Sequence, residues 1–288
     1  MQVLLTGASG FIGSRVAAAL HGAGHTPVLT ARAGTPQSPP LDLARPETID
    51  HALHTVRPDA VIHCAALRDL AACEQSPDLA RAVNLTATDR VAHACRSLGA
   101  VLVFVSTDQV FDGERGNYSE TDPTNPVNVY GTTKARAEEA VLAMGGRVAR
   151  VALTLGHSRE GTRSPNEHVV HALRHQQPCN LFTNEYRTPI LVDDVASALA
   201  EMLTLERPIL HLGGPDRVNR LELGLALADA YGLDRRGCIP TTSVNTQPLR
   251  RAADTSLNTT LARRSLSQPP RPLSEAIRAL VRTQPIAR

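Results

Sequence analysis

The stretch VLVFVSTDQVFDGERGNYSETDPTNPVNVYGTTK, residues 101–134, decides how this chain is expected to fold. It begins with an apolar, β-branched run, residues 101–105, which has the length and composition of a buried strand. The strand ends in Ser-Thr-Asp, and a polar loop with four Gly or Pro residues follows. The stretch closes on Tyr130-x-x-x-Lys134, which enters a segment rich in Ala and Glu, residues 135–144. A strand, a loop and a helix are therefore expected in this order.

Tyr130 and Lys134 are four residues apart, so one face of a helix carries both. A phenol beside an ammonium group is suited to proton transfer, because the cation favours the phenolate and lowers the pKa of the tyrosine. Lys134 is also the single lysine among 30 Lys and Arg residues. Arginine is bulkier, planar and differently directed, so a lone lysine here indicates that the position requires an ammonium group.

Length and composition limit the classes of protein to which this chain can belong. The chain has 288 residues, 42% of them hydrophobic, and a net charge of +2. This is enough for one large α/β domain with a small lobe, and it predicts no strong attraction to nucleic acid or anionic membranes. No apolar run approaches the roughly 20 residues of a membrane span. The five cysteines form no CxxC pair and the N-terminus enters a strand directly, so we expect a cytoplasmic protein with reduced thiols.

A strand, a glycine-rich turn and a helix open the chain. Residues 2–6 are apolar, and Gly7-x-x-Gly10-x-x-Gly13 and a helical run, residues 14–20, follow. Glycines let the backbone approach a pyrophosphate, and the N-terminus of a helix offers free N–H groups and the positive end of its dipole. We therefore expect a dinucleotide site formed by Gly7, Ser9, Gly10, Phe11, Ile12 and Gly13.

The end of the second expected strand, residues 26–31, indicates which dinucleotide is favoured. A carboxylate that binds the adenosine ribose belongs there, about 20 residues after the glycines. Arg32 follows the strand instead. Because a cation suits a 2′-phosphate, NADP(H) is favoured over NAD(H); the alternative is that Arg32 is a solvated loop residue.

Two further positions are candidates for the cofactor site. Asp42, followed by Leu43, is placed to reach an adenine amine, although an Asp there also suits a turn cap. The next expected strand ends in Ala65 and Ala66, whose small side chains leave room for a flat ligand.

Several histidines and one cysteine are expected to be structural. His63 and Cys64 lie within an apolar strand, so we expect them in the core. His168, His171 and His175 share one arc of an expected helix, but no carboxylate or cysteine accompanies them at ligand spacing, so we expect no metal site.

The alternation of strands and helices predicts a Rossmann-type, doubly wound parallel sheet of about six strands, with a small C-terminal substrate-binding lobe. We expect residues 1–155 to form an NADP-binding domain to which residues 187–214 return. Residues 156–186 and 215–288 are expected to form the lobe. Asp193 or Asp194 is expected to cap a helix near residue 195.

Taken together, these motifs resemble the extended short-chain dehydrogenases/reductases, and within them the dTDP-4-dehydrorhamnose reductase (RmlD-like) family. The resemblance runs from end to end. It is carried by TGASGFIG at 6–13, RPDAVIHCAA at 57–66, VSTDQVFDG at 105–113, YSETDPTNPVNVYGTTKARAE at 118–138, RTPILVDDVA at 187–196, HLGGPDRVNRLEL at 211–223 and RAADTSLN at 251–258.

The resemblance implies a catalytic triad and a reaction. Tyr130 would protonate a substrate carbonyl, Lys134 would lower the pKa of Tyr130 and hold the nicotinamide ribose, and Thr107 would hydrogen-bond the carbonyl oxygen. The reaction would be hydride transfer from NADPH to a nucleotide-linked 4-keto-6-deoxy sugar. The substrate site would include Asp108, Gln109, Arg187 and Arg251, the two arginines being candidates for the diphosphate. A homodimer through the Tyr130 helix would be possible.

The sequence departs from the family pattern in the sugar pocket. Gln109 stands where Tyr is usual, Leu153 where Trp is usual, and Ala252 where Pro is usual. Two alternatives therefore stay open. One is an NAD(P)-dependent nucleotide-sugar epimerase or a reductase of another carbonyl. The other is a non-catalytic, NADP-binding regulatory subunit like the methionine adenosyltransferase β subunit.

Overall fold

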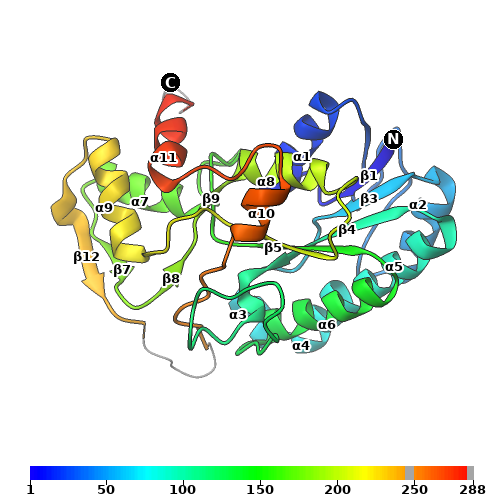
Figure 1. The fold of residues 1–288 in the computed structure, drawn as a ribbon, viewed down its shortest axis with the longest axis horizontal. Coiled ribbons are helices and arrows are strands. Elements are labelled where there is room, and N and C mark those ends of the chain that lie inside the picture. Colours follow the sequence, from blue (N-terminus) through cyan, green and yellow to red (C-terminus); the bar gives the residue numbers. More distant parts are fainter. Residues whose placement is uncertain (244–249, 284–288) are drawn as a thin grey trace.

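A six-stranded parallel sheet forms the centre of the molecule, in a computed structural model that describes residues 1–243 and 250–283. The strand order is β10-β5-β4-β3-β1-β2, and each neighbouring pair is parallel (Figure 1). The strands are nearly continuous runs of apolar residues, as expected of strands covered on both faces. Their bounds are β1 (Gln2–Thr6), β2 (Thr26–Leu29), β3 (Ala60–His63), β4 (Val101–Thr107), β5 (Arg147–Val151) and β10 (Ile209–Leu212).

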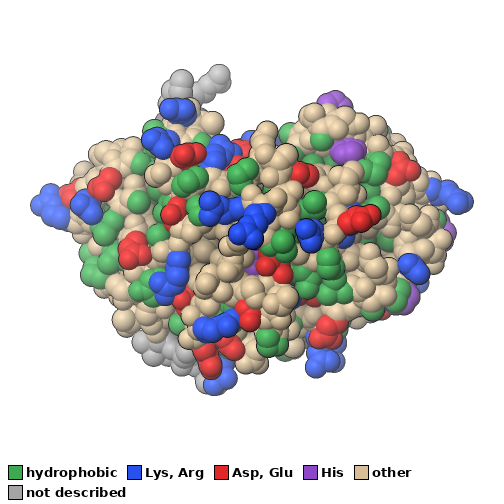
Figure 2. Space-filling view, viewed as in Figure 1, with side chains coloured by type: hydrophobic (Ala, Val, Ile, Leu, Met, Phe, Trp, Pro, Cys, Tyr) green, Lys and Arg blue, Asp and Glu red, His purple; other side chains and the backbone are tan. Residues whose placement is uncertain are grey.

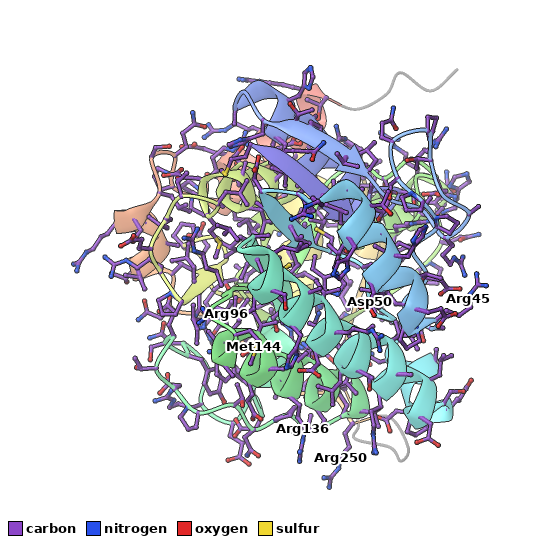
Figure 3. All side chains as sticks on the ribbon, turned by 90° about the vertical axis from the view of Figure 1, so that its right-hand side faces the viewer. Arg45, Asp50, Arg96, Arg136, Met144 and Arg250 are labelled. Carbon is purple, nitrogen blue, oxygen red and sulfur yellow. The ribbon has the colours of Figure 1, made fainter. Side chains whose placement is uncertain are left out.

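Helices cover both faces of this sheet, which confirms the doubly wound fold. On one face, α1 (Phe11–Gly22), α8 (Val192–Glu201) and α10 (Thr260–Ser265) bury side chains such as Leu20, Leu199 and Ala262. On the other face, α2 (Pro46–Val56), α5 (Ala87–Leu98) and α6 (Val129–Ala143) lie side by side (Figure 3).

The order of the strands places a crevice at the carboxyl ends of β1 and β3. β1 is flanked by β2 on one side and β3 on the other, so the chain goes from β1 to β2, crosses back over β1 to β3 and then continues in this opposite direction to β4. Open α/β sheets bind ligands outside the carboxyl ends of the strands at such a switch point. The glycine turn follows β1 and Thr107 ends β4, so both lie at this edge.

The smaller lobe stands beside the carboxyl end of the sheet. Its core contains Leu173, Leu227 and Ile277 from α7 (Pro165–Arg174), α9 (Arg220–Ala230) and α11 (Leu273–Arg282) (Figure 1). Short strand pairs complete the lobe and its junction: β7 (Cys179–Phe182) with β12 (Cys238–Thr241), β8 (Tyr186–Arg187) with β11 (Val218–Asn219), and β6 (Thr154–Leu155) with β9 (Ile190–Leu191). Our division into two domains stays a proposal; within it, Ala262 and Leu266 from the 215–288 segment pack in the core of the larger domain.

The remaining elements are short. They are α3 (Leu70–Gln75), α4 (Pro77–Arg81), the π-helical turn η1 (Ala82–Thr86) that joins α4 to α5, and the 3-10 turns η2 (Asp108–Val110) and η3 (Arg235–Gly237). In residues 1–243 and 250–283, no helix has the length and apolar character needed to cross a membrane. Basic and acidic side chains are interspersed on the face shown in Figure 2, in keeping with the small net charge.

The cap expected near residue 195 was wrong. The helix α8 begins at Val192 with Leu191 as N-cap, so Asp193 and Asp194 lie in its first turn. The Asp194 carboxylate instead accepts a 2.8 Å hydrogen bond from Nε of Arg271. This contact joins residues 77 positions apart, and no local pattern reveals it.

Candidate active site

The glycine turn is sterically obligatory. Gly7 has φ +69°, and a Cβ on it would lie 2.8 Å from the backbone nitrogen of Ala65. A Cβ on Gly13 would lie 2.2 Å from the carbonyl oxygen of Gly7. Gly10 is the N-cap of α1 and supplies no side-chain cap, so the N–H groups of the first turn have no side-chain acceptor there. These features suit a pyrophosphate cradle.

The other turn residues line or support this cradle. Ser9 is exposed, and Phe11 and Ile12 are partly buried, with Ile12 packed against the core. The Thr6 hydroxyl accepts from the backbone nitrogen of Ala65 at 3.2 Å and hydrogen-bonds Nδ1 of His63 at 2.7 Å. Ala65 and Ala66 therefore stand directly beside the glycine turn.

The expectation that His63 belongs to the core is confirmed. Its ring is fully buried, and Nε2 lies 3.2 Å from the Thr88 hydroxyl. Burial, and secondarily the charge of Lys134, lower the pKa of His63 to about 3, so the ring is neutral. Cys64 is partly buried, and burial raises the pKa of its thiol to about 12.

Arg32, Asp42 and Leu43 occupy the loops after β2. Arg32 is exposed just beyond the end of the strand, at Leu29, and no ion pair of Arg32 occurs within the described ranges 1–243 and 250–283. The Asp42 carboxylate accepts from the backbone nitrogen of Ala44 at 3.1 Å, which is the turn-capping role. Leu43 is buried in the core beneath α2. Arg32 is thus an exposed cationic side chain just beyond the carboxyl end of β2.

Thr107, Tyr130 and Lys134 come together at the carboxyl end of β4. Thr107 is the last residue of β4, and the Asn128 side chain caps α6 by accepting from the backbone nitrogen of Gly131 at 2.8 Å. This cap starts α6 so that Tyr130 lies in its first turn and Lys134 one turn later. The Tyr130 phenol lies near enough to Thr107 for the Thr107 hydroxyl to influence its pKa.

The expected lowering of the Tyr130 pKa was wrong for this structure. Burial raises the pKa of Tyr130 to about 12, and the nearby Thr107 hydroxyl opposes this rise without cancelling it. The Lys134 ammonium is turned toward β4, where Nζ donates to the Val105 carbonyl oxygen at 2.7 Å and lies 3.8 Å from the Phe104 ring centroid. Burial lowers the pKa of Lys134 to about 7.

Asn84 supports the triad from the π-helical turn, a role that we did not predict from its place in an expected helix, residues 78–98. Its amide oxygen accepts from the backbone nitrogen of Leu67 at 2.8 Å, and its nitrogen lies 3.2 Å from the Thr133 hydroxyl. Thr133 in turn donates to the Tyr130 carbonyl oxygen at 2.8 Å. Asn84 therefore ties the segment beside the glycine turn to the first turn of α6. Such π turns occur often at functional sites.

Asp108 and Gln109 follow Thr107 in the 3-10 turn η2, at the carboxyl end of β4. The buried Asp108 carboxylate accepts from the hydroxyls of Thr107 at 3.2 Å and Thr255 at 3.0 Å, and lies 3.6 Å from Nε of Arg187. The Gln109 side chain donates to Asp108 at 3.3 Å. Asp108 thus links the triad to a group of arginines.

This group contains Arg187, Arg220 and Arg251 around the fully buried Glu185. Nε of Arg251 donates to the Glu185 carboxylate at 2.7 Å, and Nε of Arg220 lies 3.8 Å from its second oxygen. That second oxygen has no hydrogen-bond partner in the described residues. Arg220 and Glu185 were not anticipated from the sequence, because Glu185 meets Arg220 and Arg251 across 35 and 66 positions.

Arg187 is committed to the backbone. Its terminal nitrogens donate to the carbonyl oxygens of Ala252 and Ala253, both at 3.0 Å. Leu153, one of the departures from the family pattern, packs against the core of the lobe, and Ala252 is buried. Burial lowers the pKa of Arg220 to about 10, and the charges of Arg187 and Arg251 add to this effect.

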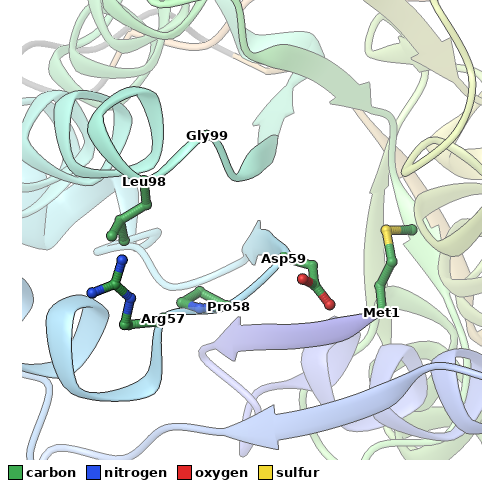
Figure 4. A pocket seen from close by; sticks show the side chains of 6 residues that line it. All are labelled: Met1, Arg57, Pro58, Asp59, Leu98 and Gly99. Carbon is green, nitrogen blue, oxygen red and sulfur yellow. The ribbon is translucent and has the colours of Figure 1, made fainter.

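Two other expected or visible features lie away from this edge. His171 and His175 stack with ring centroids 4.2 Å apart on the lobe helix α7 and its end. A hollow of about 540 Å³ lies at the opposite, amino-terminal edge of the sheet (Figure 4). It is lined by Met1, Arg57, Pro58, Asp59, Leu98 and Gly99. Neither feature touches the triad.

Comparison with known proteins agrees with this fold and shows the family of the chain. The family model for the RmlD substrate binding domain matches residues 1–285. The chain belongs to the RmlD family. It is 32% identical over 242 residues to methionine adenosyltransferase 2 subunit beta of Mus musculus, covering 81% of this chain and 72% of that one. It is 38% identical over 147 residues to dTDP-4-dehydrorhamnose reductase of Burkholderia thailandensis, covering 51% of this chain and 47% of that one.

Solved structures of RmlD-type proteins have the same fold. A hypothetical dTDP-4-dehydrorhamnose reductase from Sulfolobus tokodaii superposes with a TM-score of 0.85 at 29% identity, covering 94% of this chain and 97% of that one. The dTDP-4-dehydrorhamnose reductase of Bacillus anthracis, solved in complex with NADP, gives 0.86 at 20% identity, covering 97% of each chain.

Proposed function

We propose that this RmlD-family chain is an NADPH-dependent reductase of a carbonyl on a nucleotide-linked 4-keto-6-deoxy sugar. The observation that carries the proposal is the assembly of Thr107, Tyr130 and Lys134 beside a glycine cradle at one sheet edge. Thr107 comes from the end of β4, Tyr130 and Lys134 come from α6, and the glycines follow β1, at the edge where α/β folds bind ligands.

The residues present fit a dinucleotide phosphate. Gly7, Gly10 and Gly13 leave room that a side chain would fill, and the first turn of α1 offers its N–H groups to the pyrophosphate. Arg32 would hold a 2′-phosphate, since no carboxylate stands at the end of β2 to bind a ribose hydroxyl. When bound, the nicotinamide supplies the hydride.

The triad supplies the proton and the orientation. Tyr130 stays protonated at neutral pH because burial raises its pKa to about 12, so it is suited to donate a proton to the oxygen of a carbonyl being reduced. Thr107 would hydrogen-bond the same oxygen and stabilise its developing negative charge. Lys134 would bind the nicotinamide ribose, for which its Nζ would rotate from the Val105 carbonyl.

The arginine group would bind the diphosphate of the substrate. Arg187, Arg220 and Arg251 carry three positive charges against the carboxylates of Glu185 and Asp108, which leaves one positive charge in excess. Guanidinium groups suit phosphate oxygens because they donate in a planar fork. Arg220 and Arg251 would make the contacts with the phosphate oxygens. The terminal nitrogens of Arg187 already donate to the carbonyl oxygens of Ala252 and Ala253, and these bonds order the backbone next to Arg251.

A second candidate function is an NADP-binding regulatory subunit. The similarity to methionine adenosyltransferase 2 subunit beta, which extends over more of the chain than the similarity to the Burkholderia reductase, favours it. In this second candidate function the cleft binds NADPH, the triad catalyses no reaction, and a partner enzyme binds elsewhere on the surface. An epimerase is a weaker candidate, because Arg32 disfavours NAD.

The test is oxidation of NADPH in the presence of dTDP-4-keto-6-deoxyglucose or its 3,5-epimerised form. We expect consumption that requires the sugar, is faster with NADPH than with NADH, and disappears in Tyr130→Phe. Tyr231→Phe, at the end of α9 in the lobe, is the matched control and should remain active. Full turnover in Tyr130→Phe would overturn the proposal. Tight NADPH binding without turnover of either sugar, together with a stable complex with a second enzyme, would favour the regulatory candidate.

A further inference from the structure

A buried charged network lies behind Lys134, on the side away from the substrate cleft. Glu138 is one turn beyond Lys134 on α6 and is 2% exposed. Its carboxylate accepts from Nη2 of Arg150 at 2.8 Å and from Nε at 3.0 Å, and also from the Ser106 hydroxyl. A buried carboxylate held in this way by a guanidinium is ionised.

On its far side, Arg150 forms no second ion pair within residues 1–243 and 250–283, but its charge acts on the nearby Glu120 carboxylate, which accepts from the backbone nitrogen of His211 at 3.1 Å. Nη1 of Arg150 lies 3.3 Å from Nε2 of His211 and 3.5 Å from the backbone carbonyl oxygen of Glu120. The guanidinium has only donors, so Nε2 of His211 accepts and the ring is neutral. Burial, reinforced by the charge of Arg150, lowers the pKa of His211 to about 3, in agreement. Glu138 is therefore the carboxylate that pairs directly with Arg150, and the charge of Arg150 acts on Glu120 as well.

The groups that face Lys134 leave Glu138 as the source of negative charge. From β3 and its end, His63 is neutral and Cys64 is a thiol with its pKa raised to about 12. On α6 itself, Tyr130 is protonated, because its pKa is raised to about 12. Burial lowers the pKa of Lys134, and the charge of Glu138 is the first influence that opposes this.

We propose that Glu138 is a positioning residue of the active site, because its charge keeps Lys134 cationic and its bond to Ser106 holds the strand end that carries Thr107. Arg150 limits how strongly Glu138 favours the cationic form of Lys134, because the positive charge of Arg150 partly offsets the negative charge of Glu138. The two residues thus act on Lys134 in opposite directions. Removal of the carboxylate makes Lys134 lose its proton at lower pH, whereas removal of the guanidinium makes it lose its proton at higher pH.

The single lysine of the chain makes this directly measurable. Protein grown on lysine labelled with ¹³C at Cε has one lysine resonance, and its shift with pH gives the titration midpoint of Lys134 without any assay of activity. We expect Glu138→Gln to lower the midpoint by about one pH unit, the small end of the range for a nearby opposite charge. Arg150→Met should raise it. Glu139→Gln, the exposed neighbour on α6, should leave it unchanged.

A double variant keeps the test valid where a single change unfolds the protein. Removal of one partner of a buried ion pair is strongly destabilising because it leaves an uncompensated charge, whereas replacement of both partners is often tolerated. Glu138→Gln combined with Arg150→Met should therefore fold and still show a lowered midpoint. Midpoints unchanged from the wild type, or shifted in the same direction by Glu138→Gln and Arg150→Met, would overturn the inference.

An effect of Glu138 on turnover is expected only if the proposed function holds. The inference about Glu138 and the proposed function can therefore fail separately. If Lys134 acts as a cation in turnover, the basic limb of the pH–rate profile moves to lower pH in Glu138→Gln, together with the resonance. A shifted resonance in a protein that reduces no sugar would uphold the inference and count against the proposed function. An unshifted Lys134 resonance in Glu138→Gln, in a protein whose wild type reduces the sugar, would support the proposed function and overturn the inference about Glu138.

Discussion

A methyl group on Gly13 gives the sharpest test of the glycine cradle. In Gly13→Ala the new Cβ would stand 2.2 Å from the carbonyl oxygen of Gly7, whereas ordinary contact begins at 3.4 Å. The difference is 3.4 − 2.2 = 1.2 Å, and the obstacle is backbone, so α1 or the turn has to move by about that distance. Overpacking of this kind costs about 1–3 kcal/mol of stability.

The functional cost of this displacement should be larger than the cost in stability. A misplacement of about 1 Å lowers the rate of an oriented reaction by about 10²-fold. Denaturant unfolding would measure the first effect, and NADPH binding and NADPH-dependent turnover would measure the second. Gly22→Ala is the control, because Gly22 is the exposed last residue of the same helix and nothing lies within 4 Å of its added Cβ. That variant should be neutral or more stable by up to about 1 kcal/mol. Unchanged stability and NADPH affinity in Gly13→Ala would refute the reasoning.

Three further predictions follow from the site and its surroundings. Arg32→Ser should weaken NADPH binding at least tenfold and leave NADH binding nearly unchanged, because it removes the cation for the 2′-phosphate. Equal effects on the two cofactors in binding titrations would contradict this prediction. Asn84→Ala should lower turnover and destabilise the protein by about 1–3 kcal/mol, since the backbone groups of Leu67 lose their partner; an unaltered unfolding curve would argue against the link. His63 and His211 are neutral in the folded protein but take up a proton in the unfolded chain below about pH 6.5. The free energy of unfolding should therefore fall by about 2 kcal/mol per histidine between neutral pH and pH 5. Replacement of His63 by Gln should remove the contribution of His63 to this pH dependence.

The sequence predicted those parts of the site that are encoded by local spacing. Gly7, Gly10 and Gly13 stand within one turn, and Tyr130 and Lys134 share one helix face, so their proximity needs no knowledge of the rest of the fold. The parallel sheet was predictable for the same reason, because each strand is a short apolar run followed by a helical segment. The family model over residues 1–285 confirms the resemblance.

The parts that were missed depend on long-range contacts. Arg150 reaches Glu138 from the next strand, and Glu185 gathers Arg220 and Arg251 from 35 and 66 positions away. No periodicity marks such partners. The sign of the Tyr130 pKa was wrong because spacing shows which charges are near along the helix but not how deeply the phenol is buried, and burial dominates here.

The central claim is that this chain moves a hydride from NADPH to a carbonyl carbon, with Tyr130 as the proton donor. The most direct measurement uses NADPH deuterated at the transferable position of the nicotinamide, with dTDP-4-keto-6-deoxyglucose and its 3,5-epimerised form as substrates. The account predicts a reduced sugar that carries one deuterium on the former carbonyl carbon, formed by the wild type and not by Tyr130→Phe. A protein that binds the labelled cofactor and transfers no deuterium to either sugar would contradict it.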